Sequence, residues 1–413
     1  MSLSAAAAAP LRGALYVESH QNRLIDVDPL RAVAFVAASV DGSCTGVYAW
    51  RPSEASPSER KRIVAPRLAT LRDVVSFESA TLVSSGDGHA LLAPTGRHAG
   101  VIAEWSARRE RVVDEFSLAY SAERDGAAQP LKISSLAMAG DPSTSATIEV
   151  VGAARSTIFA ASLDPREPHA AAPYTLDLIT HSGRAYGKQY VDRTFTCVAT
   201  TGDGRTVAGD ASGALYLFSK IGSPATHRFE AAVDRAVTSV DATRGGRYVC
   251  ATTARGGVLV VGPFEDGSWS RAKGKPPAVF CTLSAEKRFE LGIAASEEYK
   301  GGRFLGDGRL TVAIAHFVLV FNIECNDSDD DADSDDDDAD EIISNSAERI
   351  LARQASAWML REFSQYVNLT HRTGYHRCRI HATPAPVVAH HALPDCGSDV
   401  VALGDCVGAL SLG

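Results

Sequence analysis

A repeat between residues 195 and 261 constrains the fold more than any other feature of this chain. One copy runs from Phe195 to Phe218 and the other from Val237 to Val261. Each copy has the pattern strand, Gly-containing turn, strand, Gly-containing turn, strand. A period of roughly 40 residues with several short strands is typical of a β-propeller blade. One blade cannot bury both of its faces alone, so the repeat predicts a ring of blades.

The length of the chain suits one complete ring. Its 413 residues exceed the roughly 280 to 350 that seven blades of about 40 to 50 residues need. Further strand-and-turn patterns occur at residues 74–93, 101–116, 148–179, 306–321 and 387–412. We therefore predict an all-β fold, a seven-bladed WD40-like β-propeller with a disordered acidic insertion and one helix before the last blade.

The two ends of the chain predict how the ring closes. The last pattern, Val387 to Leu412, has no fourth strand behind it, and the first two, Gly13–Glu18 and Arg23–Val27, have little nearby to pair with. Joining both ends in one mixed blade would remove an exposed strand edge. The expected parts are a disordered leader at residues 1–10, the propeller blades with the closing strand at residues 11–325, and the last blade at residues 368–413.

An acidic segment interrupts the pattern before the last blade. Eleven carboxylates and no basic residue lie between Asp327 and Glu341, and without them the chain, of net charge −9, would be close to neutral. The segment has nothing to bury, so residues 326–343 are predicted to be disordered. Ser328 and Ser334 are candidate sites for an acidophilic kinase, each phosphate adding roughly −1.5 to −2 charges. The segment is either a solvated spacer or a switchable electrostatic arm for a basic partner.

A helix is predicted at residues 344–367, directly after the acidic segment. Ser and Asn residues at its start suit an N-cap, and apolar residues follow at near-helical spacing. The helix either packs against the side of the propeller or is presented to a partner. The candidate partner-binding residues are Ile350, Leu351, Trp358, Met359 and Phe363.

Several segments also resemble a known family. They are Arg111–Phe116, Asp164–Arg166, Lys188–Tyr190, Phe195–Thr201, Gly213–Gly222, Gly246–Thr252 and Asp399–Leu403. In this order and spacing they resemble the C-terminal propeller of the Vid-twenty-seven-like proteins, named for vacuolar import and degradation. The resemblance implies a cytosolic, non-catalytic, WD-like propeller with no established small-molecule site.

Motifs for catalysis are missing from the sequence. It contains no Gly-rich phosphate loop at a strand-to-helix junction, no Gly-x-Ser-x-Gly elbow and no His-Glu-x-x-His pair. His376, Cys378 and His381 are the best metal candidates, but their spacing differs from the paired ligands of structural zinc sites, so we interpret them as ordinary loop and strand residues. Cys197 and Cys250 lie in apolar strand patterns, which predicts buried free thiols. No catalytic residue, cofactor or metal site is predicted.

These observations predict a non-catalytic scaffold that binds proteins in the cytoplasm, with the nucleus as the alternative location. No strong basic excess suggests a nucleic-acid groove. No apolar run reaches the roughly 18 residues of a membrane helix, and no small-molecule substrate is predicted. Two alternatives stay open: a propeller enzyme, or an acidic-arm chaperone or assembly factor for basic nuclear or ribosomal proteins.

Overall fold

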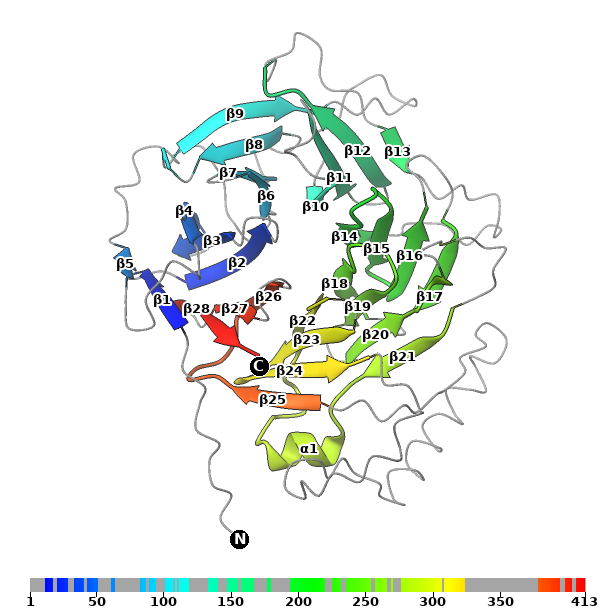
Figure 1. Ribbon diagram of the computed structural model, residues 1–413. Coiled ribbons are helices and arrows are strands. Elements are labelled where there is room, and N and C mark those ends of the chain that lie inside the picture. Colours follow the sequence, from blue (N-terminus) through cyan, green and yellow to red (C-terminus); the bar gives the residue numbers. More distant parts are fainter. Residues whose placement is uncertain are drawn as a thin grey trace.

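The computed structural model contains seven β-sheets that form a closed ring (Figure 1), which confirms the predicted seven-bladed propeller. The structure describes residues 12–17, 21–28, 33–40, 43–50, 61–63, 82–86, 89–93, 101–106, 108–109, 111–118, 133–139, 147–154, 157–166, 177–179, 194–219, 225–231, 235–253, 257–265, 269, 276–306, 308–323, 378–393, 398–402 and 406–412.

Blades one to three use the first part of the chain. Blade one contains β2 (Gln21–Asp28), β3 (Val33–Val40) and β4 (Ser43–Trp50). Blade two contains β6 (Leu82–Gly86), β7 (His89–Leu92), β8 (Val101–Ser106) and β9 (Arg111–Ser117). Blade three contains β10 (Ile133–Met138), β11 (Ile148–Ala154), β12 (Thr157–Leu163) and β13 (Asp177–Ile179).

Blades four to six follow the same order from the inner to the outer edge. Blade four contains β14 (Phe195–Thr200), β15 (Thr206–Asp210), β16 (Ala214–Phe218) and β17 (His227–Glu230). Blade five contains β18 (Val237–Ala242), β19 (Val249–Thr253), β20 (Gly257–Val261) and β21 (Ala278–Cys281). Blade six contains β22 (Tyr299–Phe304), β23 (Arg309–Ile314), β24 (Phe317–Asn322) and β25 (Cys378–Ala382).

Blade seven closes the ring with strands from both ends of the chain. It contains β26 (Ala389–Leu393), β27 (Ser398–Ala402), β28 (Cys406–Ser411) and β1 (Arg12–Val17), with β5 (Lys61–Ile63) outside β1. Strand β1 pairs antiparallel with β28, as in Leu15 opposite Val407, and parallel with β5. The N-terminal strand therefore completes the last blade, as the sequence predicts.

Two strands lie in different blades from those expected. The predicted last blade, residues 368–413, includes β25, but β25 pairs with β24 and is the outer strand of blade six. In sequence the acidic segment therefore falls between two strands of blade six, and the last blade starts at β26. The pattern at Arg23–Val27 belongs to β2, which pairs with β3 and opens blade one instead of joining the closing blade. The predicted helix at 344–367 lies outside the described residues.

The hydrophobic core is divided into layers between neighbouring blades. One layer joins Val207 and Leu215 of blade four to Val249 and Leu259 of blade five. Strands β15, β16, β19 and β20 are buried at every residue because both faces of each blade are covered. This explains why these strands are nearly continuous apolar runs without alternation.

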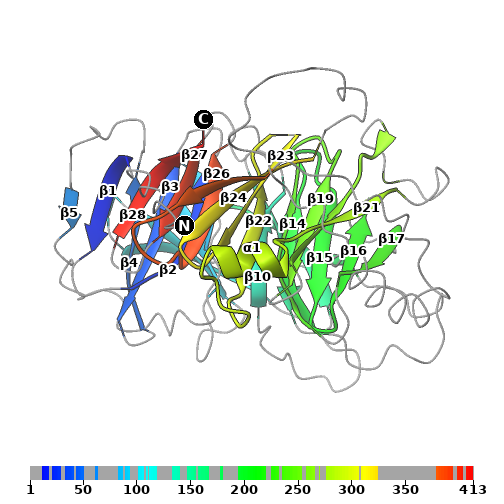
Figure 2. The ribbon, with the colours of Figure 1, turned by 90° about the horizontal axis from the view of Figure 1, so that it is seen from below.

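The antiparallel order of each blade separates its connections onto two faces of the ring (Figure 2). We name the strands of a blade a to d from the inner to the outer edge. The turns between strands a and b and the connections between strands c and d lie on one face, which we call the a–b face. The one described helix, α1 (Ala285–Glu290), lies outside the ring between blades five and six (Figure 1). It has no buried residue.

Candidate functional site

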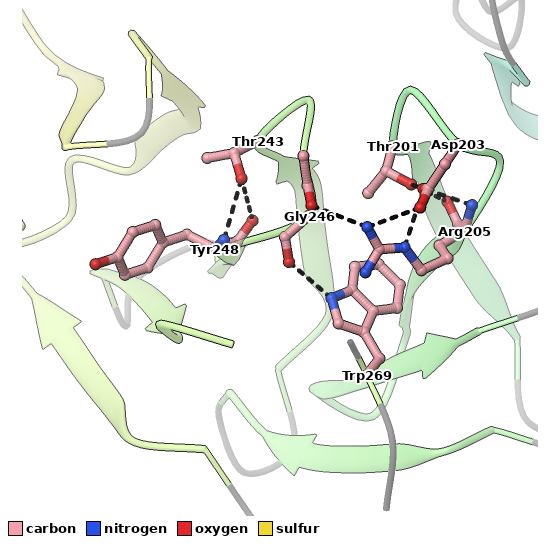
Figure 3. A network of polar contacts seen from close by, with 8 residues as sticks. Thr201, Asp203, Arg205, Thr243, Gly246, Tyr248 and Trp269 are labelled. Atoms are coloured by element: carbon pink, nitrogen blue, oxygen red, sulfur yellow. Dashed lines mark hydrogen bonds and ion pairs between the residues drawn. The ribbon is translucent and has the colours of Figure 1, made fainter. Parts of the chain in front are cut away.

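The a–b turns of blades four and five are tied to each other on the a–b face (Figure 3). The Gly202 N–H donates to the carbonyl oxygen of Arg244 at 2.9 Å, and Arg205 Nη2 donates to that of Gly245 at 2.9 Å. Within each turn a threonine hydroxyl accepts from the backbone N–H of the residue that ends the turn. These bonds are Arg205 N to Thr201 Oγ1 and Tyr248 N to Thr243 Oγ1, both 3.1 Å.

Arg205 is the centre of this turn network (Figure 3). Its Nε donates to Asp203 Oδ1 at 2.9 Å, and its guanidinium carbon lies 4.8 Å from the centre of the Trp269 ring. Trp269 Nε1 donates to the carbonyl oxygen of Gly246 at 2.8 Å. Gly246 has φ +67°, and a Cβ there would lie 2.5 Å from Arg205 Nη2, so glycine is needed for both conformation and space. The a–b turns of blades four and five and the β20–β21 connection of blade five are therefore held together as one unit.

The turn network leaves charged side chains at the surface. The Asp203 side chain is 59% exposed, whereas that of Arg205 is 11% exposed. Partial burial acts to raise the pKa of Asp203, but the hydrogen bonds from Arg205 and Thr201 outweigh it and hold the pKa below its ordinary value. Arg244 and Arg247 are exposed beside it. The network is suited to hydrogen bonding with another surface.

A second group of ionisable residues lies on the inner strands. We call it the inner-strand cluster, and it consists of Asp26, Asp241, Arg303, His390, His391 and Asp399. Its members come from β2, β18, β22, β26 and β27, which belong to blades one, five, six and seven. The a-strands of these blades are neighbours in the ring. Ring closure therefore brings together charges that are far apart in the sequence.

His390 joins blade seven to blade six. Its Nδ1 lies 2.8 Å from Asp399 Oδ2 and its Nε2 lies 2.9 Å from the carbonyl oxygen of Gly301, and both ionisable side chains are fully buried. The carbonyl can only accept, so Nε2 carries a proton and donates to it. One further proton lies between Nδ1 and the carboxylate. The pair resembles the His–Asp part of a catalytic triad, but both ring nitrogens are engaged and no substrate can reach them.

Arg303 and Asp241 link blades five and six. Arg303 Nη1 donates to the carbonyl oxygen of Val240 at 3.2 Å, and Asp241 Oδ2 accepts from the Phe304 N–H at 2.9 Å. Burial raises the pKa of Asp241, against the opposing effects of the Arg303 charge and the Phe304 N–H. This carboxylate is therefore a stronger proton acceptor than an exposed one.

His391 lies on the side of blade seven that meets blade one. Burial, helped by the nearby Arg303 charge, lowers its pKa to about 3, so the ring is neutral at pH 7. Its Nε2 is 3.5 Å from Asp26 Oδ1, a contact that favours the protonated ring and opposes this shift. The His391 and Asp26 side chains are 23% and 21% exposed, so this part of the cluster is open to solvent.

Four cysteines whose side chains the structure describes, Cys197, Cys250, Cys281 and Cys378, are free thiols with pKa values raised by burial. Cys197 and Cys250 are buried free thiols, as predicted. Burial raises the pKa of Cys197 to about 11 and that of Cys378 to about 12, so neither is a thiolate at neutral pH. Within the described part of the chain, no three His, Cys, Asp or Glu side chains are grouped so as to hold a metal ion. His376 lies outside it.

The site residues singled out from the sequence lie outside the described residues. They are Ser328 and Ser334 of the acidic segment and Ile350, Leu351, Trp358, Met359 and Phe363 of the expected helix. They remain predictions.

Sequence reasoning missed the inner-strand cluster. The available signal is a charged residue inside a strand pattern that is otherwise apolar or small. Asp241 in Val-Thr-Ser-Val-Asp-Ala and Arg303 in Tyr-Lys-Gly-Gly-Arg-Phe both show it. Each strand alone contributes one or two such residues. Only the order of blades around the ring shows that they meet.

The closed ring, the completion of its last blade by the N-terminal strand and the blade-to-blade contacts define a WD40-like β-propeller. The family model of the VID27 C-terminal WD40-like domain matches residues 143–275, about a third of the chain. This match confirms the resemblance seen in the sequence, and the turn network lies within the matched residues. No curated protein matches the chain.

Two solved structures share the fold. The β-propeller domain of Myceliophteria thermophila Cps50 (Swd1) has a TM-score of 0.57 at 9% identity, covering 96% of this chain and 99% of that one. Chaetomium thermophilum Raptor has a TM-score of 0.54 at 12% identity, covering 98% of this chain and 29% of that one. The chain thus spans less than a third of the length of Raptor. Among the described residues no helix is long and apolar enough to cross a membrane.

Proposed function

We propose that this chain is a non-catalytic scaffold that binds other proteins. The observation that carries the proposal is the sealed His390–Asp399 pair. Its 2.8 Å contact between a ring nitrogen and a carboxylate would suit acid–base chemistry, yet both side chains are fully buried and both ring nitrogens are hydrogen-bonded. A general base must come within hydrogen-bond reach of its substrate. The pair therefore stabilises the ring, and function falls to the surface loops, as in propeller scaffolds.

The a–b face is the proposed binding face. Its turn network is held by hydrogen bonds between blades, which lowers the entropy lost when a partner binds. The connection between β24 and β25 starts and ends on this same face and contains the acidic segment. A rigid polar surface and a highly charged segment would thus meet a partner from one side.

The acidic segment would select basic partners. Eleven carboxylates create a negative field that attracts Lys- and Arg-rich surfaces and is screened over roughly 8 to 10 Å at ordinary ionic strength. Phosphorylation of Ser328 and Ser334 would strengthen this field. An amphipathic helix carrying Trp358 and Phe363 would add apolar contacts. We further propose a cytoplasmic location and, from the resemblance, a role in vacuolar import and degradation.

A second candidate function is an assembly factor or chaperone for basic nuclear or ribosomal proteins. The acidic run favours it, because long acidic segments commonly serve as interaction tails. The two candidates differ in the identity of the partners and in whether the charge of the segment is needed to retain them.

Affinity purification with quantitative mass spectrometry tests the proposal. Three forms are compared: wild type, a deletion of residues 327–341, and a variant of equal length with Asn or Gln at the eleven acidic positions. For an electrostatic arm, the same basic proteins are lost from both altered forms. For a spacer, partners are lost from the deletion alone. Failure of the wild type to retain any stoichiometric protein would contradict the scaffold.

A further inference from the structure

Helix α1 exposes a large apolar side chain. Phe289 is 86% exposed, and no other large apolar side chain in the described part of the chain exceeds 41%. A six-residue helix is not stable by itself in water, and α1 buries none of its own residues. Hydrogen bonds to neighbouring groups therefore hold α1 in place, and its aromatic ring is left in contact with water.

Local contacts fix α1 against the loop that leads to β22. The Ser284 hydroxyl caps the helix by accepting from the Lys287 N–H at 3.0 Å. Arg288 Nη2 donates to the carbonyl oxygens of Ala294 at 3.2 Å and Glu297 at 2.7 Å. Its guanidinium carbon also lies 5.6 Å from the centre of a tyrosine ring in β22. The phenylalanine that follows this arginine is therefore exposed on a fixed support.

The chain enters β25 beside α1. Residues 324–377, which connect β24 to β25, lie outside the described part of the chain, and β25 starts at Cys378. Leu283 and Leu291, on either side of α1, pack in the same apolar cluster as Cys378. Burial raises the pKa of Cys378 to about 12, and the nearby charge of Lys287 on α1 acts in the opposite direction. Figure 1 shows α1 beside β25. The connection therefore ends close to the exposed helix.

We propose that the helix expected at residues 344–367 packs on Phe289 of α1, at the side of the propeller between blades five and six. Trp358 and Phe363 supply apolar surface to cover the exposed ring, whereas the acidic segment before them has none to offer. The chain between the end of this helix and β25 spans roughly 30 Å or more when extended, which is enough to reach back over α1. The occupant of this surface is thus a segment of the same chain.

Docking of the helix controls when its apolar residues reach a partner. A partner that binds Trp358 or Phe363 must displace the helix from α1, so the two contacts exclude each other. In the docked state the acidic segment starts after β24 and ends at a helix that is held beside β25. The contact forms within one chain and requires no partner, so it stands independently of the proposed scaffold role.

Hydrogen exchange of the full-length chain tests the contact. We expect slow exchange across residues 344–367 in wild type and exchange at least about tenfold faster in Phe289→Ser, because the helix loses the aromatic surface on which it packs. Phe289→Leu keeps an apolar side chain and should retain most of the protection. Val388→Ser changes another exposed apolar residue and should behave as wild type does. Fast exchange in wild type, or equal exchange in wild type and Phe289→Ser, would overturn the proposal.

Photo-crosslinking of the purified full-length chain identifies what covers α1. Benzoyl-phenylalanine in place of Phe289 should form crosslinks to residues 344–367 of the same molecule, which mass spectrometry locates. The yield should fall several-fold in Trp358→Ala, which removes the largest apolar side chain of the helix. Ser356→Ala is the control, because residues two apart lie on nearly opposite sides of a helix. Crosslinks to a second copy alone, or to no part of residues 344–367, would overturn the docking.

Discussion

The inner strands of blades two to four differ from those of blades five, six, seven and one. In the first group, β6, β10 and β14 contain no Asp, Glu, Lys, Arg or His. Neighbouring blades there are joined by hydroxyls, such as Ser134 Oγ donating to the carbonyl oxygen of Phe195 at 2.9 Å. In the second group, charged and titratable residues make the equivalent contacts, as His390 does to Gly301.

The difference shows that one blade geometry accepts two kinds of inter-blade contact. A neutral hydroxyl bond adds about 0.5 to 1.5 kcal/mol and does not depend on pH. A buried charged contact costs more to desolvate and more to break, and it responds to pH and to ions. We call blades two to four the hydroxyl half and blades five, six, seven and one the charged half. The inter-blade contacts of the hydroxyl half should not change with pH. The charged half contains the β1–β28 pairing that closes the ring and the groups that could recognise a ligand.

The largest effect on stability is expected from removing β1, the strand that closes the ring. Deletion of residues 12–17 removes β1 and exposes the edge of β28. It should lower the free energy of unfolding, because several backbone hydrogen bonds between β1 and β28 are lost. Thermal unfolding measures the loss, and hydrogen exchange should show it first in blade seven and last in blade four. Deletion of residues 1–10 is the control and should have no effect. Wild-type melting of the β1 deletion would mean that β1 does not close the ring.

The next largest effect is expected from removing one inter-blade contact in the charged half, compared with one in the hydroxyl half. His390→Ala leaves the Asp399 carboxylate buried without its partner and should cost about 3 to 5 kcal/mol. Thr196→Val removes a hydroxyl that donates to the carbonyl oxygen of Val237 between blades four and five, and should cost about 1 kcal/mol. Urea unfolding measures both. Equal losses in the two variants would remove the distinction between the halves.

A smaller effect on the free energy of unfolding is expected when the pH is lowered. His391 has a pKa of about 3 in the folded chain against 6.5 as its ordinary value. Between these values the unfolded chain binds the proton more readily, so the free energy of unfolding falls as the pH decreases below 6.5. The loss at pH 5 should be at most about 2 kcal/mol, reduced by the opposing charge of Asp26.

Unfolding between pH 7 and 5 measures the contribution of His391. His391→Gln should flatten the decline relative to wild type, whereas His316→Gln, at an exposed position, should not. Asp241 acts in the opposite direction because its pKa is raised. The difference between the two variants therefore isolates His391. An unchanged slope in His391→Gln would show that the pKa of His391 is the same in the folded and unfolded chains, which would contradict the lowered value.

The smallest effect is expected from the acidic segment. Deletion of residues 326–341 should change the free energy of unfolding by less than about 0.5 kcal/mol, because the segment has no large apolar side chain to bury. Chemical denaturation and hydrogen exchange check this, and strong amide protection across the segment in wild type would refute it.

The fold could be predicted from the sequence where Gly-containing turns mark the repeat. The turns at Gly202–Gly204 and Gly245–Gly246 separate apolar strands and locate blades four and five. Strand β25 was placed in the wrong blade because a long insertion separates it from β24 and breaks the period. Helix α1 gives no periodic signal because none of its residues is buried.

The candidate site was harder to predict than the fold. Trp269 and Arg205 are distant in sequence, and their contact depends on how two blades are placed side by side. The same holds for Arg303 and Asp241. A single charged residue in a strand shows only that something unusual occurs there, and its partner is found from the order of the ring.

The pairing of β1 with β28 has a consequence for how the protein is made. A ribosome releases the first strand long before its partner, so β1 waits without its antiparallel neighbour until almost the whole chain has emerged. This contact has the longest sequence separation in the fold, and such contacts form late and slowly. During that interval the unpaired strand is a target for pairing with other chains. We therefore expect ring closure to limit the yield of native protein. Chaperones and the concentration of other newly made copies of the chain should affect the yield at this step.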